Sequence, residues 1–380
     1  MKKKTPKIKR IKLSVKKANK IFATVISRGS SMNERGDSKS LSKEDQGEDE
    51  APDSKIRLFS PLASHVLCKQ LEGATNYEEG TTGLWAMRTA KGYGAILEED
   101  HPFEFGVASR ESYLKFLKTP ISVGALKNAS SFRTFWYERL LSVDDVIRSL
   151  VFTPSMLSFQ IFKGIRDAPG GFVPMPYFWE RSKDNHSVSI IGYDNEKKVL
   201  KFFNSWGKDW GDRGIGYLPY DYVKRFLVES WASMRDVRKG QRGTIKQVGE
   251  YEFEFLTYRS LVGGRQNLQV IDVYKDAVIA AWAHFRYYEN YRRIEIEEIF
   301  VMPKFRRQGI AGRLLSYIEE NAAEVSALKI VAYIHVQDLV TEERIASIEE
   351  LFSAKKGYEV FPQGKKFRGS AYRAEKIFTI

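Results

Sequence analysis

The hydrophobic and polar positions divide the chain into a polar beginning and two patterned regions. Residues 28–55 are rich in serine, aspartate and glutamate and hold almost no large apolar side chains. Such a segment cannot offset the entropy cost of ordering by burial. Residues 1–56 are therefore predicted to be a tail and linker, and folded structure is expected from about Ile56 onward.

The first patterned region places helices before strands. Apolar residues recur at helical spacing over 60–72 and 82–91, and a short helix is expected at 146–150. Strand-like alternation follows over 155–162, 187–193, 199–204 and 214–219. This order predicts an α+β domain over 57–236, with a helical layer against an antiparallel β layer.

The second region follows a basic, glycine-bearing connector at 237–247 and mixes the two periodicities. Helices are predicted at 309–323 and 341–352. Strands are predicted at 251–262, 268–274, 277–288, 292–301, 329–336, 358–361 and 371–378. The interleaving predicts an α/β domain over 248–380 with a mixed central sheet.

Length and composition narrow the class of protein. A chain of 380 residues exceeds one ordinary core, so two domains are expected. There is no run of eighteen apolar residues, so we expect no membrane span. No apolar core follows the first lysines, so we expect no secretory signal at the start of the sequence. The chain has a single cysteine, Cys68, which excludes an internal disulfide. A cytoplasmic protein without a metal site is expected.

The net charge of +13 is concentrated at the start of the chain. Residues 1–20 hold ten Lys and Arg and no acid, whereas the other 360 residues are close to balanced. A basic tail can bind an anionic partner through counterion release, or it can be a solvated arm. The body of the chain carries no motif that reads DNA or RNA.

The most specific pattern of the second region lies where the strand at 292–301 enters a basic turn and then a helix. This arrangement directs backbone N–H groups and the positive end of a helix toward one point. Arg306, Arg307 and Arg313 add positive charge, while Gly309 and the small Ala311 allow close approach. The ligand that this suits is a pyrophosphate.

The stretch Arg306-Arg-Gln-Gly309-Ile-Ala311 resembles the Arg/Gln-x-x-Gly-x-Gly/Ala fingerprint of the GNAT family of N-acetyltransferases, and the likeness covers about residues 250–380. The resemblance implies acetyl-CoA as cofactor and an amine of a peptide, protein or small molecule as acceptor. It implies that the main chain of Phe300 and Val301 holds the pantetheine arm. The candidate cofactor-binding residues are Phe300, Val301, Arg306, Arg307, Gln308, Gly309, Ile310, Ala311, Gly312 and Arg313.

Acetyl transfer also needs a base that takes a proton from the amine. Glu295, Glu297 and Glu298 are the candidate bases, since all three lie on the strand before the turn. The family often has a tyrosine acid where this chain has Ser353, and an asparagine where it has Ala346. The acid is therefore left unassigned.

A second motif lies in the first region. His186-Ser-Val-Ser-Ile-Ile-Gly-Tyr-Asp is followed by Asn204-Ser-Trp-Gly-Lys-Asp-Trp-Gly-Asp-Arg-Gly, with two tryptophans and four glycines in register. These stretches resemble the papain-like cysteine peptidases. The resemblance implies that His186 is a general base, that Asn204 orients it, and that Trp206 shields their hydrogen bond.

The cysteine nucleophile of such a site is missing whichever of two segments is matched to the peptidase family. In one, Gly83-Leu84-Trp85-Ala86 matches the start of the nucleophile helix, and Leu84 replaces the cysteine. In the other, residues 58–103 match the segments that follow this helix, and Cys68 falls at a structural position. A histidine and an asparagine cannot perform nucleophilic acyl chemistry alone.

Three functions follow from these motifs. The favoured one is an acetyl-CoA-dependent N-acetyltransferase whose inactive papain-like domain binds a substrate or partner. The second is an active thiol peptidase that uses Cys68 with His186, and the third is a binding protein without catalysis.

Overall fold

The computed structural model describes residues 57–74, 80–102, 109–182, 184–234, 243–262, 265–335, 342–353, 356–367 and 370–378. The predicted tail and linker at 1–56 lie outside the described residues, and the domain limits remain predictions. Within the described ranges, no helix is both long and apolar enough to cross a membrane. The same ranges hold no group of three or more His, Cys, Asp or Glu side chains that could bind a metal.

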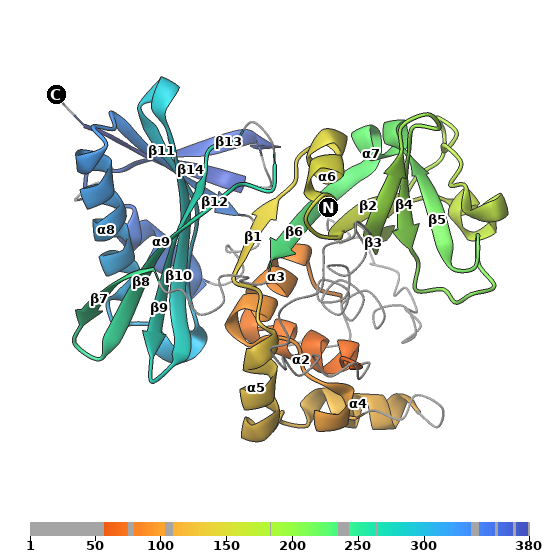
Figure 1. Cartoon of the computed structure of the whole chain (residues 1–380), viewed down its shortest axis with the longest axis horizontal. Coiled ribbons are helices and arrows are strands. Elements are labelled where there is room, and N and C mark those ends of the chain that lie inside the picture. The colour runs from red at the N-terminus through yellow and green to blue at the C-terminus, as the bar shows by residue number, and fades with distance from the viewer. Residues whose placement is uncertain are drawn as a thin grey trace, which may run out of the picture.

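The first part of the structure combines helices with an antiparallel sheet, as the sequence predicts (Figure 1). Its helices are α2 (Pro61–Glu72), α3 (Gly83–Gly92), α4 (Arg110–Lys118), α5 (Val123–Ala129), α6 (Val143–Ser149) and α7 (Tyr220–Phe226). Its strands are β1 (Trp136–Arg139), β2 (Ser155–Ile161), β3 (Asp184–Asp194), β4 (Val199–Phe203), β5 (Ile215–Pro219) and β6 (Leu227–Met234). They form a six-stranded sheet in the order β1-β6-β2-β3-β4-β5. We call this part, residues 57–234, the papain-like half.

The second part is an eight-stranded sheet in the order β13-β14-β12-β11-β10-β9-β8-β7. Its strands are β7 (Thr244–Val248), β8 (Tyr251–Tyr258), β9 (Leu268–Lys275), β10 (Val278–Tyr288), β11 (Arg293–Val301), β12 (Lys329–His335), β13 (Glu359–Phe367) and β14 (Ser370–Ile377). Its helices are α8 (Ile310–Glu324) and α9 (Glu342–Leu351). Because β11 and β12 pair in parallel and the other pairs are antiparallel, the sheet is mixed, as predicted. We call this part, residues 243–378, the transferase half.

Several elements were not predicted from the sequence: helices α4, α5 and α7 and strands β1 and β6 of the papain-like half, and strand β7 of the transferase half. Thr244–Val248, which the sequence interpretation assigned almost entirely to the connector, forms β7. The segment is exposed and polar, so it carries little hydrophobic signal. Its strand conformation comes from pairing with β8, where Thr244 lies opposite Phe255 and Val248 lies opposite Tyr251.

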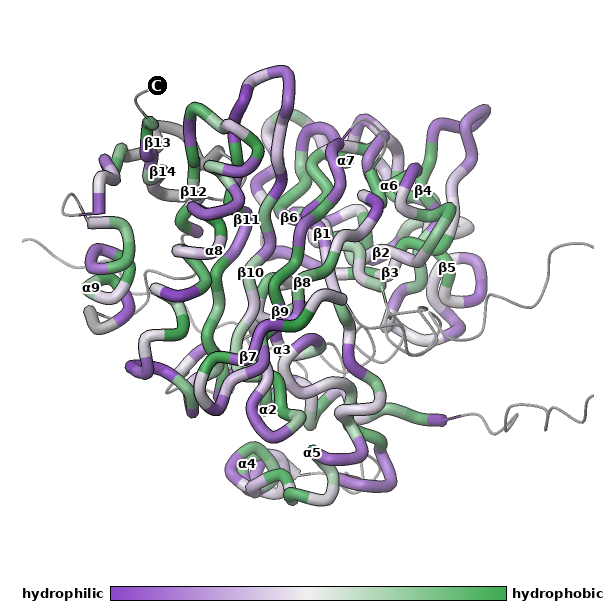
Figure 2. The backbone as a smooth tube through the Cα atoms, turned by 60° about the vertical axis from the view of Figure 1, so that its left-hand side comes forward, coloured by the Kyte–Doolittle hydropathy of each residue, from purple (hydrophilic) through white to green (hydrophobic). Residues whose placement is uncertain are grey.

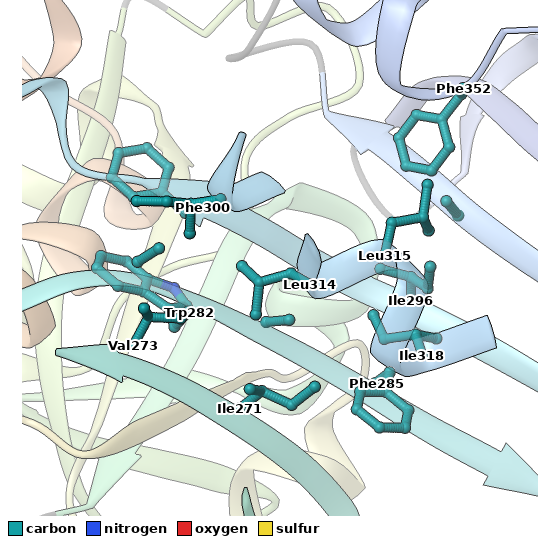
Figure 3. Packing of buried hydrophobic residues seen from close by; sticks show 14 of the residues in the cluster. Ile271, Val273, Trp282, Phe285, Ile296, Phe300, Leu314, Leu315, Ile318 and Phe352 are labelled. Atoms are coloured by element: carbon teal, nitrogen blue, oxygen red, sulfur yellow. The ribbon is translucent and has the colours of Figure 1, made fainter. Parts of the chain in front are cut away.

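The core of the transferase half lies between the sheet and α8. Leu314, Leu315 and Ile318 point from α8 toward strand residues such as Ile271 and Ile296 (Figure 3). In Figure 1, α8 covers the face of this sheet that is turned away from the papain-like half. The opposite face is therefore the one that meets the papain-like half.

The hydrophobic core continues across the boundary between the halves. Leu71 and Trp85 of the papain-like half belong to the core cluster of the eight-stranded sheet. In the other direction, Leu256, Leu268 and Val270 belong to the core cluster of the six-stranded sheet. Figure 2 shows the hydrophobic stretches along the adjoining strands of both sheets. The two halves are therefore packed as one folded unit.

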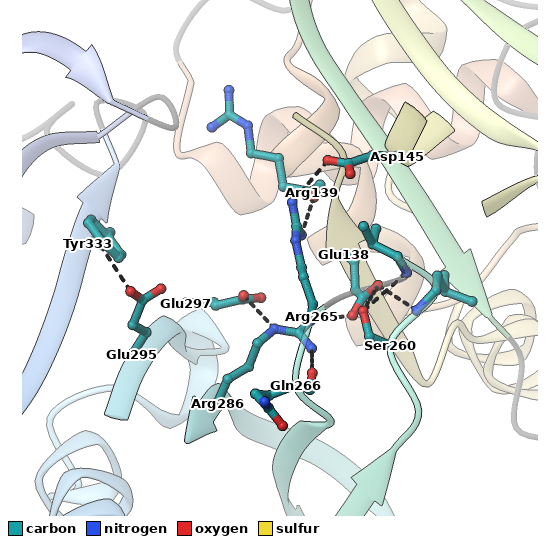
Figure 4. A network of polar contacts seen from close by, with 12 residues as sticks. Glu138, Arg139, Asp145, Ser260, Arg265, Gln266, Arg286, Glu295, Glu297 and Tyr333 are labelled. Carbon is teal, nitrogen blue, oxygen red and sulfur yellow. Dashed lines mark hydrogen bonds and ion pairs between the residues drawn. The ribbon is translucent and has the colours of Figure 1, made fainter. Parts of the chain in front are cut away.

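Buried ion pairs cross the same boundary. Lys91 Nζ lies 2.8 Å from Asp272 Oδ1, and both side chains are 1% exposed. Arg286 of β10 pairs with Glu138 of β1, and Glu138 also accepts a hydrogen bond from the backbone of Leu261 (Figure 4). A buried charge that loses its partner is strongly destabilising, so these pairs hold the two halves in a defined register.

Candidate active site

The principal cleft lies where β11 and β12 separate. The two strands pair only from Arg293–Ile296 against Lys329–Ala332, although β11 continues to Val301 and β12 to His335. A cleft of about 460 Å³ opens at this divergence, between the strand ends, the start of α8 and helix α9. Backbone groups along the end of β11 thus border an open space instead of a neighbouring strand.

The turn before α8 presents bare backbone to this cleft. Arg307 and Gly309 have left-handed φ values of 62° and 75°, and Gly309 is the N-cap of the helix. A Cβ added at Gly309 or Gly312 would meet no atom within 4 Å. The positive end of a fifteen-residue helix and an uncrowded backbone are the features that a phosphate group requires.

Most of the predicted cofactor-binding residues come together in this cleft. Phe300, Val301, Arg306, Arg307, Gly309, Ile310, Ala311 and Gly312 line it. Gln308 and Arg313, both described, are not among the lining residues. Gln308 instead accepts a hydrogen bond from Tyr251, and Arg306 Nε donates to the carbonyl of Val301 at 3.2 Å. The Val301 carbonyl is thus partly engaged within the protein.

The three candidate bases have different surroundings. The side chain of Glu295 is 2% exposed and pairs with Arg293. The side chain of Glu298 is 4% exposed and pairs with Arg88 at 2.6 Å. The side chain of Glu297 is 21% exposed, pairs with Arg286 at 2.8 Å and lines the cleft. Of the three carboxylates, Glu297 is therefore the most accessible.

A β-bulge explains why two adjacent glutamates line one space. His284 lies opposite Glu298 and Phe285 lies opposite Ile296, so Glu297 is the extra residue of β11. Neighbouring side chains of a regular strand point to opposite faces. The bulge interrupts this alternation, and both Glu297 and Glu298 line the same cavities.

Other polar residues of the site were not singled out in the sequence. Tyr333 and His335 come from β12 and line the cleft beside Glu297. His335 Nε2 lies 3.4 Å from the Glu297 carbonyl oxygen. The predicted strand at 329–336 contains both residues, but no local motif distinguishes them from ordinary strand positions.

The papain-like half contributes to the cofactor cleft directly. Trp85 and Arg88 of α3 line it. The Arg88 guanidinium lies 4.6 Å from the ring centres of both Trp85 and Phe300. On the other side, Arg344 of α9 lies 4.8 Å from the Trp85 ring and donates to the Leu71 carbonyl at 2.9 Å. Helix α3 therefore forms part of the wall of a cleft in the other half.

Glu298 is held by three groups from around the boundary. Besides Arg88, it accepts hydrogen bonds from the Tyr137 hydroxyl of β1 and from Trp282 Nε1, the latter at 3.1 Å. Burial and the Glu298 carboxylate together raise the pKa of Tyr137 well above its ordinary value. The phenol therefore stays protonated and continues to donate.

The two residues of the peptidase-like motif do meet. His186 of β3 and Asn204, just after β4, are joined by a 2.9 Å contact between His186 Nε2 and Asn204 Oδ1. The Trp206 ring stacks on the imidazole with 4.9 Å between ring centres and 27° between the planes. The Asn204 oxygen also accepts from the Ser205 backbone N–H at 2.9 Å.

Both candidates for the nucleophile position are buried in the papain-like half. Cys68 is fully buried, and its Sγ lies 3.8 Å from the Trp85 carbonyl. Burial raises the pKa of this thiol to about 12. Leu84 packs against Tyr137 and Trp231. Cys68 thus lies against α3, and Leu84 lies in an apolar cluster.

Family models match both parts of the chain. Residues 231–346 match the model described as acetyltransferase (GNAT) family, and residues 154–232 match the model described as papain family cysteine protease. Both resemblances seen in the sequence are thereby confirmed, in the predicted order. Each match covers less than half of the chain.

Individual proteins that resemble this chain share only low sequence identity with it. An uncharacterized peptidase C1-like protein of Acanthamoeba polyphaga mimivirus is 27% identical over 172 residues, which are 41% of this chain and 51% of the relative. The chain thus spans about half the length of this curated relative. Xylellain, a cysteine protease from Xylella fastidiosa, is 21% identical, with a TM-score of 0.43, over 48% of this chain and 72% of its own. The PaiA N-acetyltransferase of Thermoplasma acidophilum, solved with coenzyme A, is 18% identical, with a TM-score of 0.23, over 29% of this chain and 60% of its own.

Proposed function

We propose that this protein is an acetyl-CoA-dependent N-acetyltransferase. The observation that carries the proposal is the cleft at the divergence of β11 and β12, because the bare turn at Gly309 opens into it. The match of residues 231–346 to the acetyltransferase family supports acetyl-CoA as the cofactor. Phe300 and Val301 would hold its pantetheine arm. Its pyrophosphate would be held by the lining residues of the turn, Arg306, Arg307, Gly309, Ile310, Ala311 and Gly312.

Bound acetyl-CoA would supply the acetyl group of its thioester to the acceptor amine. Glu297 is the proposed base, since it has the most accessible carboxylate of the three candidates and lies on the cleft. Glu298 and Glu295 are proposed to position their neighbours, because arginine side chains already pair with their carboxylates. Tyr333 and His335 are candidate proton donors, as both line the cleft beside Glu297.

The papain-like half is proposed to have lost peptide hydrolysis. A thiol whose pKa is raised to about 12 is almost entirely uncharged at neutral pH, and the thiolate is the nucleophile. An aliphatic side chain at Leu84 cannot attack a carbonyl. The His186–Asn204 pair would then contribute to the fold instead of to peptide hydrolysis.

The experiment that tests the cofactor site is calorimetric titration of acetyl-CoA into the wild-type protein and two glycine variants. In Gly309→Glu the carboxylate is placed at the phosphate turn, so the heat of binding should disappear. The matched control is Gly249→Glu in the β7–β8 turn, where φ is 59° and a Cβ meets no atom within 4 Å. Because both variants impose similar backbone strain and charge, only the location differs.

Three results distinguish the candidate functions. Binding that is lost only in Gly309→Glu supports the acetyltransferase. Absence of binding to the wild-type protein at about 1 mM acetyl-CoA would favour the binding protein without catalysis. Rapid alkylation of Cys68 that slows in His186→Ala would favour the thiol peptidase.

A further inference from the structure

A second, smaller cavity of about 50 Å³ lies between the two halves. The papain-like half contributes a wall that contains Leu84, Tyr137, Arg139, Leu141 and Trp231. His284, on β10, lines it from the transferase half. A cavity lined in this way exists only because the halves are packed together.

This cavity adjoins the proposed cofactor cleft. Glu297, Glu298, Tyr333 and His335 line both spaces. A ligand in the small cavity would therefore meet the same side chains as the reacting end of a ligand in the large cleft.

The small cavity also holds a polar group that lacks a partner. His284 is 1% exposed, and its Nε2 has no hydrogen-bond partner among the described residues. Burial, with Lys91 and Arg286 nearby, lowers the pKa of this imidazole well below its ordinary value. Glu298, opposite His284 on β11, is held by Arg88, and Tyr137 packs its ring edge-on against the imidazole at 4.9 Å. The uncharged ring has one nitrogen lone pair that can accept an N–H.

We propose that this cavity is the acceptor pocket of the acetyltransferase, and that it takes the amino end of a single aliphatic amine of the lysine side-chain type. The inference rests on the proposed function and assigns the papain-like half a direct part in choosing the substrate. A space of about 50 Å³ has room for a few water-sized groups, such as an amino group and one or two methylenes. Sugars and nucleobases are too large for it.

The lining residues suit such an amine. Tyr137 supplies an aromatic face for a methylene stem, and Trp231 adds apolar surface, with the Arg139 guanidinium 5.6 Å from its ring centre. The carboxylates of Glu297 and Glu298 line the cavity and attract one ammonium. Arg265 is paired with Asp145 at 3.1 Å, but a second ammonium on the acceptor would meet the like charge of Arg139. These features favour a lysine side chain over a polyamine.

The reaction then balances without a further reagent. The bound ammonium loses one proton to the base Glu297, and the resulting amine loses a second proton as its nitrogen forms a bond to the acetyl carbonyl carbon. The bond from that carbon to the CoA sulfur breaks, and the sulfur takes up a proton. The products are the acetamide and the free thiol of CoA.

The test uses charge changes at the rim of the cavity. Leu141 lines it and is 38% exposed, so Leu141→Glu and Leu141→Lys should fold. We expect Leu141→Glu to tighten and Leu141→Lys to weaken binding of N-α-acetyl-lysine methylamide, each by roughly threefold to fivefold. Calorimetry on the cofactor-free protein measures this binding, and the acceptor KM should change in parallel while acetyl-CoA affinity stays constant.

The matched controls are Val151→Glu and Val151→Lys, at a position that is 77% exposed in the same half and does not line the cavity. Equal effects at positions 141 and 151 would overturn the location of the pocket. Preference for spermidine, or no binding of the lysine analogue while acetyl-CoA binds, would overturn the substrate class. Failure of the proposed function is recognised separately, because acetyl-CoA itself would then not bind.

Discussion

The two halves of this protein each contain a recognisable catalytic arrangement, but the arrangements differ in what they retain. In the transferase half, the turn at Gly309 and the end of β11 border an open cleft of about 460 Å³. In the papain-like half, His186 and Asn204 meet at 2.9 Å, yet Cys68 is buried against α3. One site has an open space for a ligand, whereas the other has an oriented histidine and, in the same half, a buried thiol.

The comparison separates a site built around an ordered hydrogen bond from a site built around an open space. The contact between His186 and Asn204 is short and is covered by the Trp206 ring. A thiolate is still needed for nucleophilic catalysis. In contrast, the cofactor cleft is marked by groups that the protein itself leaves without close neighbours, such as the backbone at Gly309 and Gly312.

The largest effect is expected from breaking the ion pair that joins the two regions. Arg88→Met leaves the Glu298 carboxylate buried without its cation, which should lower the free energy of unfolding by roughly 3–5 kcal/mol. Urea denaturation measures this change. The control is Lys224→Met, which breaks the exposed pair with Asp221 and should cost less than about 1 kcal/mol. Equal costs would show that the pair with Glu298 does not hold the halves together.

A smaller effect on the free energy of unfolding is expected from the ionisation of Cys68, and it distinguishes a structural cysteine from a reactive one. Burial raises the pKa of Cys68 from its ordinary value of 9.0 to about 12, so the folded state favours the neutral thiol. The stabilisation is present below pH 9 and is lost as the pH rises from 9 toward 12, by roughly 1 kcal/mol per pH unit. Urea denaturation at several pH values should show this loss in the wild-type protein and a weaker one in Cys68→Ala.

The burial of Cys68 also predicts that its thiol is alkylated slowly in the folded protein. Iodoacetamide at neutral pH should label Cys68 at least a hundredfold more slowly in the folded protein than in urea. The rate in His186→Ala should match the wild-type rate. Fast labelling of the folded wild-type protein would contradict the structural assignment of this thiol.

The smallest effect is expected at the peptidase-like pair. Asn204→Ala removes the acceptor of the Ser205 N–H and the partner of His186, which should destabilise the fold by about 1 kcal/mol. Thermal unfolding measures this. An unchanged midpoint would mean that the pair contributes nothing to folding and would leave its presence unexplained.

The features that were predictable from the sequence are local ones. Helix α8, its glycine N-cap and the basic turn lie within a few neighbouring residues, so spacing and residue type were sufficient. The approach of His186 to Asn204 also follows from two adjacent antiparallel strands, β3 and β4. The order of helices and strands then indicated both folds.

The contacts across the halves were not predictable in this way. Glu298 is a candidate base by position, but Arg88, which holds it, lies 210 residues away in the sequence. Lys91 has the pattern of a solvated basic residue at the end of a helix, yet it is buried beside Asp272. His284 carries no motif, and its environment depends on packing between β10 and the papain-like half. Hydrophobic periodicity contains no information on such partners.

The core shared by the halves has a consequence for how the protein responds to its ligand. Because Leu71 and Trp85 of one half pack into the core of the other, the two halves are expected to unfold together. A ligand that binds the folded state stabilises whatever unfolds with its site, by about 3 kcal/mol at a hundredfold excess over Kd. Acetyl-CoA bound between β11 and α8 would therefore also protect the peptidase-like sheet from proteolysis, so cofactor supply would determine the lifetime of the whole chain.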